Sequence, residues 1–259
     1  MASNGYIKNI DNSPIAMPAA FAATLNRIGG HSRVAVYGHN PTAAAGADVW
    51  EGGGAYPFQA AATVLEILSA SASDTAAGTG ARTFLLTGLD TNYNVVSETL
   101  TMNGTTPVQT VNSYLRVNGL NILTAGSGLT NAGDVTLRVT GAGATQGIAR
   151  AGYGYAKTCI YTVPKGFSML VTDLLFECSG TGTTSVIQYG FTRINYVSSM
   201  LQVTNEYLAG PLFPVQRSVI VGALVAQQTT LTPRIVAATG TVGAYASFEG
   251  ILIDNTQLI

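Results

Sequence analysis

Short apolar segments recur along most of this chain, and turn-forming residues separate them about every 8–12 residues. The segment 95–102 shows the pattern most clearly, because Val96, Leu100 and Met102 share one face and hydroxyl-bearing residues occupy most of the other. This period of two is typical of a strand with one buried face. Almost no helical period interrupts it after residue 30, so the chain is constrained to an all-β fold of the sandwich or jelly-roll kind.

Turn signals on both sides of this segment predict two hairpins. Residues 89–94 join it to a preceding apolar strand at 83–88, and Asn103-Gly104 leads into the next strand. Glu98 interrupts the apolar face of the segment. We therefore expect this face to reach an edge of the sheet or an interface at Glu98.

A glycine- and alanine-rich stretch between residues 141 and 154 is the best linker candidate. With 259 residues, the chain has room for two domains of ordinary size. We predict two tandem antiparallel β-sandwich, jelly-roll-like domains at residues 31–145 and 157–259, joined by a Gly-rich linker at 146–156. The two halves do not align with each other, so the prediction is one of similar architecture without a sequence repeat.

Residues 1–30 are predicted to form an extended N-terminal arm. Pro14 and Pro18 make a continuous helix or a central strand unfavourable, although a short helix starting at Pro18 is compatible with the sequence. The apolar side chains of the arm cannot form a core of their own, so we expect them to be buried on a neighbouring subunit or on the axis of an oligomer. The candidate assembly contacts are Ile15, Met17, Phe21 and Leu25.

Charged residues make up only 10% of the chain, against roughly 25% in an average soluble domain. The 12 basic and 13 acidic residues leave a net charge of −1 and no basic stripe, which excludes a nucleic-acid partner. Low charge is typical of a subunit whose surface is covered by neighbours, or of a secreted or virion protein with a neutral, hydroxyl-rich surface. We expect an assembly component that forms a homo-oligomer, with a trimer favoured.

The sequence contains no segment suited to crossing a membrane as a helix, which needs about 20 apolar residues in a row. The longest apolar run, residues 219–226, has the length of a strand, and a signal peptide is not expected at the N-terminus. The two cysteines, Cys159 and Cys178, have neither CxxC nor zinc-site spacing. Pairing across two strands stays open, but we favour two buried reduced thiols in a protein made in a reducing cytosol.

No pattern in the sequence points to catalysis or to a cofactor. Neither His31 nor His39 lies in the context of a nucleophile motif. The glycine-rich pieces lack the lysine of a phosphate loop, and the acidic residues are too scattered for a calcium loop. We predict no catalytic residues, no cofactor, no metal site and no enzymatic activity.

The loop around Trp50 is the one place where an alternative stays open. Asp48 and Glu51 flank Trp50, and paired carboxylates beside aromatic rings are used by glycosidases and glycan-binding proteins. In the interpretation that we favour, Trp50 and Tyr56 instead anchor a long loop onto the sandwich. These two aromatic residues are the candidate loop or ligand contacts.

Four neighbouring motifs resemble sequences of virion proteins from tailed bacteriophages, especially short-tailed phages of marine bacteria and cyanobacteria. They are ASDTAAGTGAR at residues 72–82, GLDTNYN at 88–94, SET at 97–99 and MNGTTPV at 102–108. The resemblance covers residues 45–125, and the family has no catalytic residues to carry over. It implies a structural protein of the virion, assembled in the host cytoplasm.

Resemblance and composition together predict a capsid decoration or cement protein on the outside of the head. Its partners would then be further copies of itself and the major capsid protein or other virion proteins. A tail, collar or head–tail connector protein and a double-jelly-roll capsid subunit are alternatives within the same class. A glycan-binding adhesin that uses the Trp50–Tyr56 loop is the alternative from another class.

Overall fold

The computed structural model describes residues 6–8, 14–16, 30–180, 186–195, 200–209, 223–238 and 242–257. Over these residues the secondary structure consists of 17 strands and one short 3₁₀ helix, without an α-helix. The all-β class predicted from the sequence is therefore confirmed. No helix in this described part of the chain is long and apolar enough to cross a membrane.

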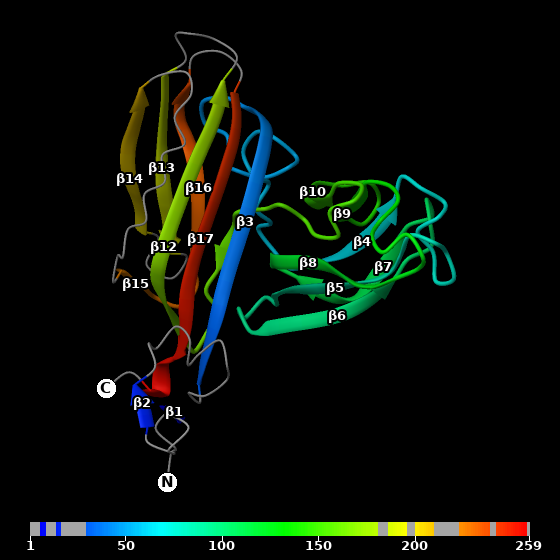
Figure 1. The fold of residues 1–259 in the computed structure, drawn as a ribbon, viewed down its shortest axis with the longest axis horizontal. Coiled ribbons are helices and arrows are strands. Elements are labelled where there is room, and N and C mark those ends of the chain that lie inside the picture. Colours follow the sequence, from blue (N-terminus) through cyan, green and yellow to red (C-terminus); the bar gives the residue numbers. More distant parts are fainter. Residues whose placement is uncertain are drawn as a thin grey trace.

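The described strands pair into five antiparallel sheets (Figure 1). In chain order the elements are β1 (Tyr6–Lys8), β2 (Pro14–Ala16), β3 (His31–Ala43), β4 (Thr63–Ser69), β5 (Ala81–Leu89), β6 (Val95–Thr101), β7 (Val108–Tyr114), β8 (Arg116–Ala125), β9 (Val135–Val139), β10 (Thr145–Ala149), β11 (Tyr161–Thr162), β12 (Phe167–Gly180), β13 (Val186–Asn195), β14 (Met200–Ala209), β15 (Ala223–Val225), β16 (Thr229–Ala238), β17 (Val242–Asp254) and the 3₁₀ helix η1 (Asn255–Gln257).

Strands β4 to β10 form one β-sandwich, which we call the inserted sandwich. A four-stranded sheet in the order β10-β9-β4-β7 packs against a three-stranded sheet in the order β6-β5-β8. Inward-pointing side chains from both sheets form its core, namely Leu65, Ile67, Phe84, Leu86, Leu100, Leu120 and Leu137. The alternation expected for β6 is present, because Leu100 is buried while Thr99 and Thr101 are exposed.

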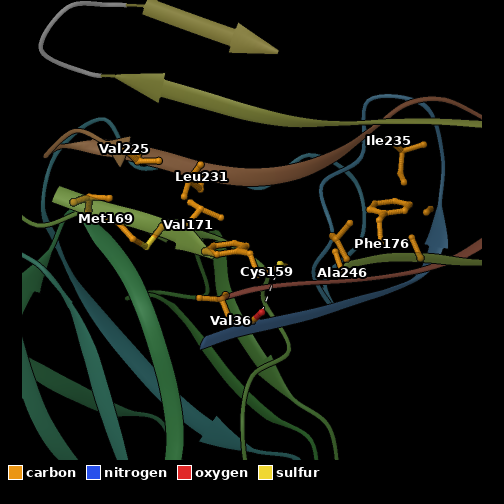
Figure 2. Packing of buried hydrophobic residues seen from close by; sticks show 14 of the residues in the cluster. Val36, Cys159, Met169, Val171, Phe176, Val225, Leu231, Ile235 and Ala246 are labelled. Atoms are coloured by element: carbon orange, nitrogen blue, oxygen red, sulfur yellow. Dashed lines mark hydrogen bonds between the residues drawn. The ribbon is translucent and has the colours of Figure 1, made fainter. Parts of the chain in front are cut away.

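Strand β3 and strands β11 to β17 form the second β-sandwich, which we call the main sandwich. Its two sheets have the orders β11-β16-β13-β14 and β15-β12-β17-β3. In Figure 2, Leu231 and Ile235 of β16 face Val171 and Phe176 of β12 across a shared core. Each sandwich thus has a large apolar core of its own.

The pairing of β3 differs from the predicted division of the chain. Residues His31–Ala43 pair with β17 rather than with the strands that follow them, so β3 belongs to the main sandwich and not to a domain at 31–145. The predicted linker at 146–156 also begins inside β10. The physical reason is that β17 has β12 on one side only, and β3, equally long, supplies the hydrogen-bonding partner on its other side. The inserted sandwich therefore interrupts the main one, and in Figure 1 it lies beside β3.

Only a small part of the predicted N-terminal arm is described. β1 and β2 pair in an antiparallel hairpin in which Ile7 lies opposite Ile15. The side chain of Ile15 is not among those described, and Met17, Phe21 and Leu25 lie outside the described residues. Their role as assembly contacts stays a prediction.

Asp74 ties two loops of the inserted sandwich together. Its fully buried carboxylate accepts hydrogen bonds from the Ser69 hydroxyl at 2.6 Å and from the Ala81 N–H at 2.6 Å. The N–H groups of Ala132 and Gly133 also donate to it, at 2.8 and 3.0 Å. One carboxylate thus connects the loop after β4 with the loop after β8. The four hydrogen-bond donors compensate its negative charge without an arginine or a lysine.

Glu98 closes an edge of the inserted sandwich. Its carboxylate accepts hydrogen bonds from the N–H groups of Val111 and Asn112, at 3.1 and 3.0 Å, and from the Asn112 amide at 2.7 Å. These bonds connect β6 of one sheet to β7 of the other. The interruption of the apolar pattern at Glu98 therefore marks a sheet edge, one of the two placements expected from the sequence.

We expect both cysteines to be unreactive in the folded protein. Cys159 and Cys178 are free thiols, and burial raises the pKa of Cys159 far above its ordinary value and that of Cys178 to about 12. The thiolate is the reactive form, and for Cys178 a rise from 9.0 to about 12 lowers its fraction at pH 8 roughly a thousandfold. A chromogenic disulfide reagent should label neither thiol quickly at pH 8 and both in denaturant. Fast labelling of native Cys178 would contradict the burial described.

Candidate functional site

The junction between the two sandwiches carries the polar side chains singled out from the sequence. The chain crosses it twice, through residues 44–62 on the way into the inserted sandwich and through 150–160 on the way out. Isolated β-bridges pair Trp50 with Thr158 and Asp48 with Arg234. The first crossing therefore contacts both the second crossing and β16 of the main sandwich.

Trp50 and Tyr56 are buried in this junction. Their side chains are only 4% and 5% exposed, and with Phe58 and Ile160 they form a small apolar cluster of their own. The Trp50 Nε1–H donates to the Gly54 carbonyl at 3.1 Å. The Tyr56 hydroxyl donates to the Gln146 carbonyl in β10 at 2.9 Å. This placement favours the anchoring interpretation, because neither ring offers a face to a ligand.

Asp48 joins the first crossing to the main sandwich. Its carboxylate is completely buried and forms a two-pronged ion pair with Arg234, at 2.8 Å from Nε and 3.0 Å from Nη2. The Tyr56 N–H donates to the same carboxylate at 2.7 Å. With a bidentate guanidinium and a backbone donor, the charge of Asp48 is compensated, and the carboxylate holds the loop against β16.

Glu51 is the centre of a second polar network. Its Oε1 lies 2.7 Å from His39 Nδ1 on β3, and its Oε2 accepts a hydrogen bond from Arg150 Nε at 2.9 Å. Arg150 reaches on to Asp134 of the inserted sandwich, with Nη1 at 2.7 Å from Oδ2. The four side chains connect β3, both crossings and the start of β9. Asp48 and Glu51 therefore lie in the same junction, but the carboxylate of each is ion-paired with an arginine there.

The junction network is expected to contribute to stability at neutral pH and less in acid. Burial alone would raise the pKa of Asp134, but the Ala151 N–H and the Arg150 guanidinium outweigh that effect and hold it below its ordinary value of 3.8. Between these two values the unfolded chain binds more protons than the folded chain. The stability that Asp134 confers is thus fully present above about pH 5 and is lost as the pH falls through 3.8 toward the lowered pKa.

An Asp134→Asn variant tests this pH dependence. We expect it to be less stable than the wild type at pH 7, with a gap that narrows as the pH falls to about 3. Urea unfolding of both proteins at a series of pH values measures the gap. A gap that stays constant over the series would show that the Asp134 carboxylate does not contribute through its charge.

A groove of about 440 Å³ opens where β3 of the main sandwich faces β8 of the inserted one. Tyr37, Asn121, Tyr155 and Thr158 are among the residues that line it. Tyr37 is 48% exposed, and its hydroxyl donates to Glu249 at 3.3 Å. Partial burial and the Glu249 carboxylate raise the pKa of Tyr37, so its phenol stays protonated.

The sequence gives little sign of this groove, because its walls come from three segments that lie far apart in the chain. The one available signal is the pair Tyr153 and Tyr155, since aromatic residues are not expected inside a flexible glycine-rich linker. Among the described residues there is no cluster of histidine, cysteine, aspartate and glutamate with the makeup of a metal site.

Comparison with known proteins defines no family for this chain. No protein-family model matches it, and no curated protein sequence matches it. A structure of infectious bursal disease virus, Gt strain, shares 10% identity over 88% of this chain and 73% of that chain, with a TM-score of 0.19. For T=1 particles derived from infectious bursal virus the values are 10%, 86%, 78% and 0.14. TM-scores this low define no common arrangement of strands.

Proposed function

We propose that the protein is a non-enzymatic structural subunit of a virus particle. The observation that carries the proposal is the junction, where two β-sandwiches with few charges are held together by two chain crossings and by buried ion pairs. The result is a subunit of two firmly joined β-sandwiches with broad sheets. Such a subunit suits repeated contacts in a shell, where each contact can be weak because many act together.

Within this class, we place the protein on the outside of a phage head as a decoration or cement protein, assembled in the host cytoplasm. The resemblance of residues 45–125 to virion proteins of tailed phages supports this role. The side chains of Val111 and Leu129 are 93% and 84% exposed, and both would gain by burial against a neighbouring chain. The partners we propose are further copies, as a trimer, and the major capsid protein.

The absence of enzymatic activity is part of the same proposal. Asp48 and Glu51 are each bound by an arginine, and Trp50 between them is buried. A glycosidase needs two carboxyl groups that face a sugar, and this pair faces the interior of the junction. Cleavage of host polysaccharide by the purified protein, abolished in a Glu51→Gln variant, would overturn this part of the proposal.

Two measurements test the structural role. Light scattering of the full chain should give a mass near three times the 26.7 kDa of one copy. Immunogold labelling of phage particles with an antibody against the protein should decorate the head. Label on the tail or collar would replace the cement role by the connector alternative, whereas unlabelled particles would contradict a virion protein altogether.

A further inference from the structure

We propose that the groove between β3 and β8 binds a neutral saccharide. The inference is independent of the virion role and concerns a place other than the Trp50 loop. The groove measures about 440 Å³, within the range of roughly 300–1,000 Å³ that ligand sites occupy. It also lies between two domains, where ligand sites are common.

The two tyrosines supply both apolar surface and hydroxyl groups. Tyr37 enters the groove from β3, and Tyr155 from the second crossing. Tyr37 is held in place because its hydroxyl binds Glu249, which is itself ion-paired with Arg33. A phenol ring with an apolar body and a polar tip fits a pyranose, which has carbon-bound hydrogens on its faces and hydroxyls around its rim.

Asn121 places an amide next to one of these rings. It forms a β-bridge with Tyr155, and the flanking hydrogen bonds run from Ile122 N to the Gly154 carbonyl and from Ala156 N to the Leu120 carbonyl. Asn121 and Tyr155 are therefore a non-hydrogen-bonded pair, the kind in which side chains lie closest. Asn121 is exposed, and an amide offers donors and an acceptor to sugar hydroxyls.

Asn118 and Thr158 form part of the groove wall but offer no free side-chain polar group to a ligand. The amide of Asn118 is committed to the backbone of Thr162 through both its nitrogen and its oxygen. The Thr158 Oγ1 is buried without a partner among the described protein groups, and Thr158 also lines a separate cavity of about 20 Å³, which is large enough for one water molecule. The polar contacts available to a ligand are therefore the Asn121 amide and the tyrosine side chains.

The charges around the groove select a neutral ligand. Every residue that lines it is uncharged. Two charged groups next to lining residues already have partners. Glu249, which accepts the Tyr37 hydroxyl, is ion-paired with Arg33, and the Lys157 ammonium lies 3.4 Å from the centre of the Tyr153 ring. A phosphate or carboxylate would lose its hydration without gaining a countercharge. A purely apolar ligand would displace water from the Asn121 amide without replacing its hydrogen bonds, so a polyhydroxyl compound fits best.

Saturation-transfer NMR on the full chain tests the proposal with glucose, galactose and N-acetylglucosamine as probes. We expect saturable binding of at least one of them. Binding should weaken at least tenfold in Tyr37→Ala and in Asn121→Ala, and should be unchanged in Val111→Ala, whose exposed side chain lies outside the groove. Asn121→Ala should keep the wild-type melting temperature, because the side chain that it removes is exposed.

Three results would overturn the inference. The first is that none of the three sugars binds saturably. The second is that Tyr37→Ala or Asn121→Ala, with a wild-type melting temperature, binds the sugar as tightly as the wild type does. The third is that glucose 6-phosphate binds more tightly than glucose. The uncharged lining would then not favour a neutral ligand over an anion.

Discussion

Replacing Asp74 with alanine is expected to destabilise the protein by about 3–4 kcal/mol, because several donors lose their acceptor and each buried one costs about 1–3 kcal/mol. The Ser69 hydroxyl and the Ala81 N–H are fully enclosed, so water cannot replace the carboxylate there. The loops after β4 and β8 then lose the group that holds them together. Urea unfolding followed by circular dichroism measures the loss.

Asp90→Ala is the matched control for this variant. Asp90 accepts three hydrogen bonds where Asp74 accepts four, from Asn92 N and from both nitrogens of Asn94, but they lie within one exposed turn. Water can serve those donors when the carboxylate is removed, so a loss below about 1 kcal/mol is expected. Equal losses of unfolding free energy in the two variants would show that burial of the Asp74 donors does not add to the cost of removing their acceptor.

Gly38→Ala is expected to cost about 3 kcal/mol, because a methyl group there overpacks the junction. An added Cβ would lie 2.4 Å from the Val49 carbonyl oxygen and 2.5 Å from both N and Cβ of Cys159. These are mostly backbone atoms, which cannot rotate out of the way. β3 would have to move off the hydrogen bond that joins Cys159 N to the Val49 carbonyl at 3.0 Å.

The readouts for this variant are the urea midpoint and the rate of limited proteolysis in the two crossings, residues 44–62 and 150–160. We expect a lower midpoint and faster cleavage there. Gly147→Ala serves as the control, because its nearest neighbour, Ala156 Cβ, would lie at an ordinary 3.5 Å. If Gly38→Ala matches Gly147→Ala in both readouts, the close approach of β3 to the crossings is not as described.

The local part of this fold can be read from the sequence, and the long-range part cannot. Alternation in 95–102 correctly places Leu100 and Met102 inside, because the period of a strand is a local property. The partner of β3 is a different matter. β17 lies about 200 residues further on, and nothing in His31–Ala43 favours it over the nearer β-rich segments.

The candidate site shows the same limit. The spacing of Asp48 and Glu51 around Trp50 is equally compatible with a sugar cleft and with a buried anchor. The arginines that decide between them lie 186 residues from Asp48 and 99 residues from Glu51. By contrast, the motif at 72–82 contains both Asp74 and Gly80, where a Cβ would come within 2.0 Å of the Asp74 carboxylate. Both residues of this motif are thus required by the local fold.

The insertion of one sandwich into the other also restricts how such genes can recombine. A single crossover anywhere between codons 44 and 160 joins β3 of one parent to β17 of the other, two strands that pair over almost their whole length. Two crossovers, one in each connecting segment, leave that pairing intact and exchange β4 to β10 as a cassette. Diversity in the inserted sandwich is therefore acquired most safely by replacing the whole unit.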